Sequence, residues 1–373
     1  MKYIKVVLLL LCVSIVGYSF LSLNNRIHAQ EEIQTTDEET LWGKIVEVVE
    51  EGKKEFNNEK QLYQKLKVLV TKGSLSGEEI EIENGALPSS EVIKYHKGDR
   101  IIISHTFDEE NNSEFFIVDF VRTKGLLILF LLFVLFTSLV GSKQGILSLL
   151  SMLISFVIIL TFILPNIQSG KDPILISIIA SIFIIPITFY LSHGFEKKVT
   201  VSIIGTIIAL IITGILSHIF VKATYLLGTA TEEILLLQTI TNTQYNLKGL
   251  LLAGIIIGTL GVLDDVTVSQ TSIVYQLYNL RKDLSTSQLF RESIKIGKDH
   301  IASMVNTLIL VYTGASMPLL LLFMSSARPF EEVINMELIS TEIVRTLVGS
   351  IGLILAVPIT TYLACIWIKK ERV

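Results

Sequence analysis

The composition of the chain excludes a soluble enzyme as the whole protein. Half of its 373 residues are hydrophobic and 18% are charged, whereas an ordinary soluble domain has about 25% charged residues. The hydrophobic residues lie in long runs, most of them close to the roughly 20 residues with which a helix crosses the ~30 Å hydrocarbon core of a bilayer. The sequence therefore predicts a polytopic α-helical protein of the lipid bilayer.

Charge divides the chain into two parts. Residues 30–124 hold 21 acidic and 12 basic residues, a net charge of −9, and the rest of the chain carries a net charge of +5. An acidic module argues against nucleic acid as a partner, because nucleic-acid binding needs a basic face. The two cysteines, Cys12 and Cys365, lie within hydrophobic runs, which excludes a disulfide framework and a metal site of clustered cysteines.

Residues 1–29 are predicted to be a signal anchor or a signal peptide. A basic start is followed by the hydrophobic run Val6–Leu23, and the residues up to Ala29 loosely fit a cleavage site. The 18 residues of the run favour a retained anchor, since signal peptides usually have about 7–15. In both alternatives Lys2 and Lys5 hold the N-terminus in the cytoplasm, so the next segment lies outside.

Residues 30–124 are predicted to form an extracytoplasmic domain. An acidic tether over 30–40 precedes five short segments that partly alternate between apolar and polar residues and are separated by turn signals. These segments are 41–49, 62–70, 79–83, 100–105 and 114–120. Such spacing is typical of a small all-β, barrel-like domain of the OB or SH3-like kind. The domain holds no metal-ligand or nucleophile pattern, and we interpret it as a spacer or a docking module.

Residues 125–373 are predicted to form the transmembrane bundle. The hydrophobic runs are 125–140, 145–164, 173–192, 199–221, 249–263, 301–324 and 340–368. When these runs alternate in direction, the inner loops and C-terminus hold eleven basic residues, and the outer loops hold only Lys171, Lys222, Lys248 and Arg328. This asymmetry follows the positive-inside rule. We expect seven helices after the outer domain, eight with the anchor, a cytoplasmic C-terminus and a surface helix in the polar outer stretch 222–248.

The fifth hydrophobic run carries the main candidate site. Gly254, Gly258 and Gly261 are spaced so that another helix backbone can approach this one closely, and Asp264 and Asp265 follow directly. Because mostly apolar residues continue beyond the two acids, the carboxylates are predicted within the membrane thickness, where an acid is a functional candidate by default. The alternative places both acids at the inner interface, in water or capping the next helix.

A cytoplasmic helix is predicted next. Ser285 and Gln288 have the spacing of a capping box, and the apolar residues that follow share one face. This pattern indicates an amphipathic helix near 285–298 that lies on the membrane surface.

The sixth run begins with a polar stripe made of Asp299, Ser303, Asn306 and Thr307, which fall at i, i+4, i+7 and i+8. Polar residues of a spanning helix normally face the bundle interior. There they line an ion path or form hydrogen bonds with neighbouring helices. His300, beside the stripe, is interpreted either as a proton relay or as a structural residue.

The last run combines a packing face with a charged pair. Gly349 and Gly352 lie at helical spacing and predict close helix packing. Arg345 follows Glu342 by three residues, so it either pairs with that acid or joins a charge network with the aspartates. Its place near the outer end of the helix disfavours a direct salt bridge to Asp264.

Four stretches of the bundle closely resemble the YibE/F family of bacterial multi-spanning membrane proteins. They are 261–270 (GVLDDVTVSQ), 297–308 (GKDHIASMVNTL), 314–322 (GASMPLLLL) and 343–352 (IVRTLVGSIG). The resemblance covers about 125–370 and, more loosely, the outer domain. It implies a multi-pass protein of the bacterial cytoplasmic membrane.

A more distant similarity is to a half of the RND and SecD/SecF transporters. Those proteins also have a helix ending near an Asp-Asp pair, followed by an amphipathic cytoplasmic helix and further spans. The similarity implies proton coupling, which here falls on Asp264 and Asp265. This sequence differs in having extra helices before the Asp helix and only one such half, so a homodimer or a paralogous membrane partner is expected.

These observations favour an ion- or proton-coupled transporter or export helper, which is not an enzyme. The alternative is a non-transporting scaffold or sensor whose outer domain binds a partner. An intramembrane aspartyl protease is disfavoured, because adjacent aspartates on one helix point about 100° apart whereas a protease dyad needs facing carboxylates. The sequence lacks a phosphate-binding loop, and we expect no nucleotide, metal or cofactor.

Overall fold

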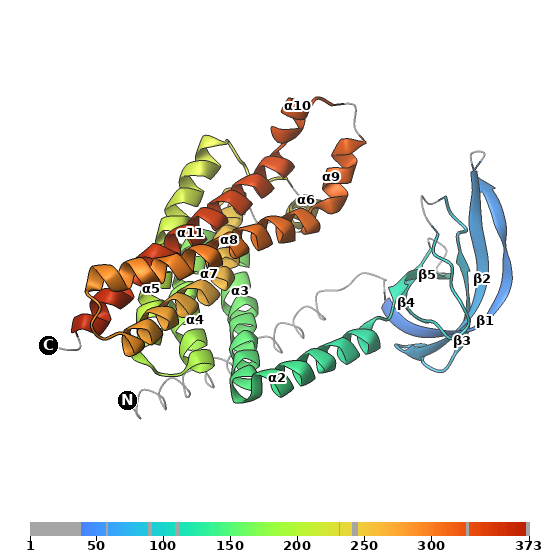
Figure 1. Cartoon of the computed structure of the whole chain (residues 1–373). Coiled ribbons are helices and arrows are strands. Elements are labelled where there is room, and N and C mark those ends of the chain that lie inside the picture. The colour runs from blue at the N-terminus through green and yellow to red at the C-terminus, as the bar shows by residue number, and fades with distance from the viewer. Residues whose placement is uncertain are drawn as a thin grey trace. The chain divides into compact units, whose positions relative to one another are not determined.

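The computed structural model describes residues 39–56, 59–88, 92–108, 112–230, 232–240, 245–325 and 328–370. The chain falls into two compact units that divide between Phe136 and Thr137, and each is described by itself (Figure 1). The predicted anchor or signal peptide at 1–29 lies outside the described residues, as does the tether as far as residue 38.

The first unit contains a five-stranded antiparallel sheet. Its strands are β1 (Glu39–Phe56), β2 (Glu59–Lys72), β3 (Glu79–Asn84), β4 (Arg100–Phe107) and β5 (Ser113–Phe120). All five predicted strands are confirmed, and their order is β3-β2-β1-β4-β5. Because β3 and β5, at the two ends of this order, approach each other, the sheet curls into a partly open barrel of the OB kind.

The pattern of the strands explains the barrel interior. In β3 the isoleucines Ile80 and Ile82 are buried and the glutamates between them are exposed, as the two-residue period of a strand requires. Irregularities in the register of β1 bend this long strand so that it pairs with both β2 and β4. Gly43 lies at this bend, where a Cβ would overlap Val68 and Ile103.

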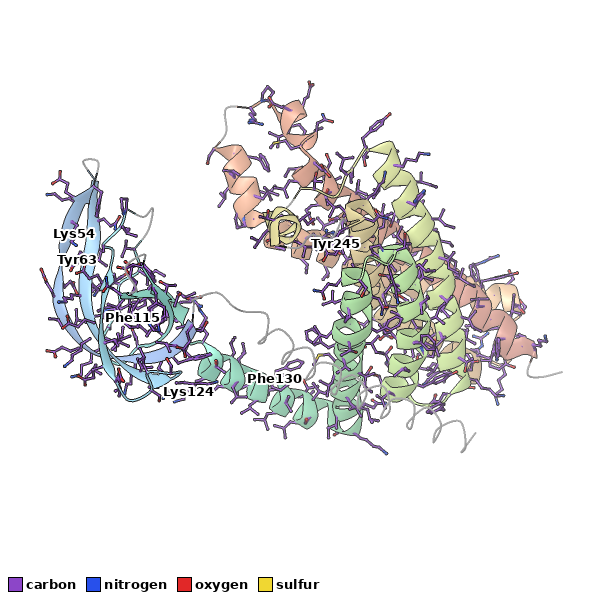
Figure 2. All side chains as sticks on the ribbon, turned by 180° about the vertical axis from the view of Figure 1, so that it is seen from behind. Lys54, Tyr63, Phe115, Lys124, Phe130 and Tyr245 are labelled. Carbon is purple, nitrogen blue, oxygen red and sulfur yellow. The ribbon has the colours of Figure 1, made fainter. Side chains whose placement is uncertain are left out.

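Several charged side chains outside the barrel are paired. On the long β1–β2 hairpin the Lys54 ammonium lies 3.8 Å from the centre of the Tyr63 ring, and Figure 2 labels both residues. Lys65 and Lys67 form ion pairs of 2.7 and 2.6 Å with glutamates of β3. The domain thus has an apolar interior and ion pairs on its exterior, as expected in water.

Helices account for the rest of the chain. They are α2 (Thr123–Ile158), a π-helical turn η1 (Ile159–Ile163), α3 (Leu164–Gln168), α4 (Pro173–His193), α5 (Lys197–Ala223), α6 (Glu232–Ile240), α7 (Leu247–Leu280), α8 (Thr286–Ala315), α9 (Met317–Met324), α10 (Phe330–Ile334) and α11 (Glu337–Lys370). In the described residues, five helical stretches are long and apolar enough to cross a membrane, or six if the bent pair α8–α9 forms one span. The protein is therefore a multi-pass membrane protein.

The seven predicted runs are all helical but are grouped differently. The first two belong to one stretch, Thr123–Gln168, which is interrupted by non-helical backbone at Ser142 (φ 48°, ψ −135°). Just after this break, a Cβ at Gly145 would collide with the Thr137 carbonyl. The first part of α2 exposes apolar side chains such as Phe130 (Figure 2), as a membrane-spanning helix does.

The amphipathic segment predicted near 285–298 is not a separate helix. Ser285 and Gln288 form the expected capping box, but α8 then continues unbroken to Ala315. Gly297 lies within this helix and does not interrupt it. A Cβ at this position would come too close to Val357 and Gln270, so the helix contact requires a glycine. In the polar outer stretch, α6 forms a short helix, as the sequence predicts.

The bundle is organised around α7, which packs against α4, α5, α8 and α11. Buried hydroxyls join α5 to α7, with 2.6 Å between the side-chain oxygens of Ser202 and Thr271 and 2.7 Å between those of Thr206 and Thr267. Small and polar residues at the interfaces hold spanning helices together in the absence of a hydrophobic driving force. The bundle interior is therefore polar at many contacts.

Candidate ion-coupling site on α7

Asp264 and Asp265 lie in the middle of α7 and point in different directions. The helix begins at its N-cap Asn246, whose side chain accepts a hydrogen bond from the Gly249 N–H, and continues past both acids to Leu280. Asp264 is half-buried, whereas Asp265 is exposed. Neighbouring helical residues are rotated by about 100°, so the two carboxylates belong to different faces of α7.

Asp264 faces α4, where it meets a histidine. Its side chain is 33% exposed, and its Oδ1 lies 4.0 Å from Nε2 of His193. Oδ1 itself is buried, and in the described part of the chain it accepts no hydrogen bond. A buried carboxylate oxygen without a donor is energetically costly. The ionised form of Asp264 therefore needs a further partner.

His193 is the last residue of α4 and was not identified from the sequence. Gly194, with φ of 84°, ends the helix and donates its N–H to the Tyr190 carbonyl. Asp265 and Lys198 are further charged groups within electrostatic range of the imidazole. The available sequence signal was a histidine between a hydrophobic run and a glycine, shortly before two predicted inner lysines.

The depth of Asp264 follows from the helix register. One turn away on α7, Thr267 contacts Thr206 of α5, and on the other side Thr259 faces Gly349 of α11. At 1.5 Å per residue, Asp264 is level with the centres of the apolar runs 199–221 and 340–368. The level of Asp264 is therefore far from the ends of α5 and α11, although it coincides with the end of α4.

Gln270 fixes the helices beside the acids. Its Nε2 donates to Oγ1 of Thr361 on α11 at 2.8 Å and to the Ser293 carbonyl on α8 at 3.1 Å. The glutamine is fully buried. Hydrogen bonds therefore join α7, α8 and α11 less than two turns from the aspartates, and they hold these three helices together on one side of the site.

The polar stripe of α8 reaches the same level but faces outward. Since Gly297 contacts Gln270, the residues that follow on α8 run alongside Asp264. The four members of the stripe, Asp299, Ser303, Asn306 and Thr307, are exposed. No hydrogen bond or ion pair between described residues joins them to the aspartates. Nε2 of His300 is buried without a hydrogen bond among the described residues.

The glycines of α7 form an uncovered face. Gly254, Gly258 and Gly261 are exposed, and no described atom lies within 4 Å of where a Cβ would be. This differs from the expectation of a helix contact, because α4, α5, α8 and α11 occupy the other faces. Glycine spacing by itself does not specify whether the second helix belongs to the same chain.

The glycines of α11 lie at contacts within the chain. A Cβ at Gly352 would overlap the Thr213 side chain of α5, and one at Gly349 would lie 3.7 Å from Oγ1 of Thr259. Gly205 of α5 is equally constrained by Thr360. These contacts set the close approach of α5, α7 and α11.

Arg345 lies away from the acids. Its guanidinium is 3.4 Å from the Glu342 carboxylate, as the three-residue spacing predicts. The contact of Gly349 with Thr259 places Arg345 roughly nine residues, or about 13 Å, from the level of Asp264, toward the start of α11. Among the residues that the structure describes, no group of three or more histidine, cysteine or acidic side chains has the geometry to hold a metal ion.

Two family models match this chain. One, described as YibE/F-like protein, matches residues 129–370, and another, described as YibE/F family N-terminal domain, matches residues 37–120. Neither a curated protein nor a solved structure matches. The distant similarity to RND and SecD/SecF transporters therefore stays a prediction.

Proposed function

The chain belongs to the YibE/F family, and we propose that this multi-pass membrane protein is an ion- or proton-coupled transporter or export helper. Asp264 and Asp265 are the groups that take up and release the proton or cation. No bond of a substrate is made or broken, so the protein is not an enzyme in this proposal.

The observation that carries the proposal is the buried Oδ1 of Asp264, which accepts no hydrogen bond from the residues that the structure describes. In a low-dielectric setting an ionised carboxylate needs a counter-charge or hydrogen-bond donors. A proton on the carboxyl, a bound cation or a protonated His193 at 4.0 Å each meets that need. The free energy of the site thus depends on whether a proton or cation is bound to Asp264, as coupling requires.

The surrounding residues suggest how occupancy is linked to movement. His193 is carried by the end of α4, next to Gly194, and Asp264 is carried by the firmly joined α7. Charging Asp264 strengthens its attraction to a protonated His193, and neutralising it removes that attraction. A shift of α4 against α7 then accompanies each change, in the manner of helices that rock around a fixed site.

The orientation of the chain is part of the proposal. The excess of basic residues in alternate loops supports a cytoplasmic C-terminus and an extracytoplasmic position for residues 30–124. The family resemblance supports the bacterial cytoplasmic membrane. In this orientation α4 ends and α5 begins on the cytoplasmic side, so His193 is the inner partner of the buried carboxylate.

The test measures charge movement in proteoliposomes that contain the purified full chain. After a rapid pH step, and separately after a Na⁺ step, transient currents are recorded on a solid-supported membrane. We expect a current with one of the two ions, its loss in Asp264→Asn, and a loss or strong reduction in Asp265→Asn. His193→Gln is expected to change the dependence of the current on pH.

A matched control is Asp283→Asn, which removes an exposed acid that pairs with Arg281 in the α7–α8 loop. It is expected to retain the wild-type current. All variants are compared at equal amounts of inserted protein. Wild-type currents in both aspartate variants, or no current with either ion in the wild-type protein, would contradict the proposed function.

A second copy of the chain completes the site in this proposal. No described residue covers the glycine face of α7 or the polar stripe of α8, and polar side chains in a spanning helix are normally shielded from lipid. With Cys12 and Cys365 replaced by serine, Gly258→Cys or Asn306→Cys is expected to form a disulfide-linked dimer in membranes. A monomer in both variants excludes the homodimer and leaves the paralogous partner.

One observation favours the alternative of a scaffold or sensor. β5 is at the end of the sheet order, and its Phe116 and Val118 are 45% and 62% exposed. Exposed apolar residues on an edge strand are typical of binding surfaces. The measurement is whether each variant corrects the growth defect of cells that lack the gene. If the double variant Phe116→Glu and Val118→Glu fails to do so while both aspartate variants succeed, the outer domain is the functional part.

A further inference from the structure

An apolar groove lies between α4 and α5 on the surface of the bundle. Its volume is about 400 Å³. Ile178 and Ile182 of α4 and Ile211 and Ile215 of α5 form its exposed walls. Its floor includes the fully buried Ile185.

Gly214 creates the middle of this groove. A Cβ at this position would have Ile256 as its nearest neighbour at 4.0 Å, so the missing side chain leaves free space above the floor. The lining residues extend along α5 from Ile207 to Ile219, a length of about 18 Å. This is a little more than half of the ~30 Å hydrocarbon core, and therefore the depth of one leaflet.

The groove leads into a second, cationic hollow at its outer end. His218 and Ile219 line both hollows, and Lys222 and Lys248 line only the second. Its volume is about 710 Å³. Two of the four basic residues of the predicted outer loops, 26 positions apart in the sequence, thus meet at the mouth of an apolar groove.

The two lysines are available for an anion. In the described residues neither Lys222 nor Lys248 forms an ion pair. The neighbouring acids have other partners, since Glu337 accepts hydrogen bonds from the N–H groups of Leu227, Gly228 and Thr229. Asp172 likewise caps the N-terminus of α4. Among the described residues, the two ammonium groups are therefore left without an acidic partner.

We propose that the α4–α5 groove and the adjoining lysine pocket bind one anionic phospholipid of the outer leaflet. One acyl chain lies in the groove over Gly214, and the phosphate lies between Lys222 and Lys248. Lysine binds phosphate through its point charge. A free phosphate leaves the groove empty, and the ammonium of a zwitterionic lipid is repelled by the lysines, so an anionic lipid satisfies both parts of the site.

The test uses phosphatidylglycerol with a photoreactive diazirine on one acyl chain. The purified full chain is placed in nanodiscs of phosphatidylcholine that contain a small fraction of this probe. After irradiation, labelled peptides are located by mass spectrometry. We expect label on α4 and α5 between Ile178 and Ile219, displaced by unlabelled phosphatidylglycerol but not by phosphatidylcholine or glycerol phosphate.

Three substitutions probe the two parts of the site. Each of Lys222→Ala and Lys248→Ala is expected to lower the apparent affinity for the probe about fivefold, and the double variant about 25-fold. Gly214→Leu fills the groove and is expected to remove the label there while the protein stays folded.

Matched controls separate these effects from general changes. Lys143→Ala removes an exposed lysine at the break in α2, and Gly314→Leu adds the same side chain at a position with open space around it. Both are expected to label as the wild-type protein does. Equal displacement by phosphatidylcholine, or full labelling in the double lysine variant, would overturn the proposal and identify ordinary boundary lipid.

Discussion

The β domain and the helical bundle differ in where they place polar residues and in what covers their outer faces. In the β domain Ile45, Leu66 and Ile103 are fully buried, while lysine–glutamate pairs lie on the surface. In the bundle, the fully buried residues include Thr206 and Thr267. The outer faces carry isoleucines that are more than half exposed, among them residues 211 and 215.

This difference reflects two environments, water around the β domain and lipid around the helical bundle. In water, the burial of apolar area is the main favourable term, so the barrel is closed by its isoleucines and leucines. In lipid, apolar contacts between helices bring little advantage over contacts with acyl chains, and small or hydrogen-bonding residues hold the helices together. Substitutions of the same kind should therefore have different effects in the two regions.

The largest effect is expected in the barrel interior. Ile103→Ala removes a fully buried side chain and should lower the free energy of unfolding of the β domain by about 2–5 kcal/mol. The measurement is urea unfolding of the full chain, followed by Trp42 fluorescence in a Trp367→Phe background. Val118→Ala, at an exposed position of β5, should change it by less than about 0.5 kcal/mol. Equal losses in the two variants would show that the barrel has no such core.

The next largest effect is expected at a glycine contact of the bundle. A Cβ at Gly205 would lie 2.6 Å from Oγ1 of Thr360, so Gly205→Val should destabilise the bundle by about 1–3 kcal/mol. Thermal unfolding in detergent measures this loss, and Gly314→Val serves as the control in open space. Thr360→Ala should restore part of the stability. If Thr360→Ala restores no stability to Gly205→Val, the loss does not arise from the close contact between α5 and α11 at Gly205.

A smaller effect is expected for a buried hydrogen bond. Gln270→Leu removes bonds to Thr361 and to the Ser293 carbonyl, and at about 0.6 kcal/mol for each the bundle should lose about 1 kcal/mol. Thr361→Val removes only one of the two bonds and should lose about half as much in the same detergent assay. A gain of stability in Gln270→Leu would mean that this interior behaves like the barrel core.

The smallest effect is expected at a charged group on the barrel surface. Hydrogen bonds from Ser74 hold the pKa of Glu39 below its usual value. The stability that this provides is present above the pKa of the unfolded chain, about 4.3, and is lost as the pH falls through the lower pKa of the folded state. Ser74→Ala should therefore reduce stability by less than about 0.5 kcal/mol at neutral pH and flatten its dependence on pH below about 4.5. Unfolding curves at pH 3 to 7 compare the two proteins.

Local patterns predicted those features that depend on neighbouring residues alone. The alternation of glutamate and isoleucine in β3 admits only a strand with one buried face. Ser285 and Gln288 mark the start of α8, because the capping box is formed by residues three apart. The pairing of Arg345 with Glu342 follows from the same kind of spacing.

Helix lengths were predicted less well. Hydropathy detects the part of a helix that lies in lipid, whereas the backbone hydrogen bonds of a helix continue without lipid. For this reason the amphipathic segment and the first part of the sixth run form a single helix, α8, which ends at Ala315. The helix α7 extends to Leu280, along the mostly apolar residues that follow the two acids.

The candidate site shows the same division. The acids Asp264 and Asp265 were identified because carboxylates are rare in hydrophobic runs, but their different exposure was not. His193 is 71 residues away in the sequence, and only the packing of α4 against α7 brings it within 4.0 Å of Asp264. No local pattern encodes such a contact.

The sequence by itself determined that this chain has an acidic five-stranded domain and an apolar multi-pass bundle, since composition and periodicity reflect the solvent around each segment. It also determined that few charges lie within the apolar runs. The tertiary structure alone decided that, among the described residues, the buried Oδ1 of Asp264 has no hydrogen-bond donor and the α7 glycines are uncovered. It also decided that Lys222 and Lys248 line one hollow. These properties depend on how distant helices pack, and packing is set by contacts between whole surfaces rather than by neighbours along the chain.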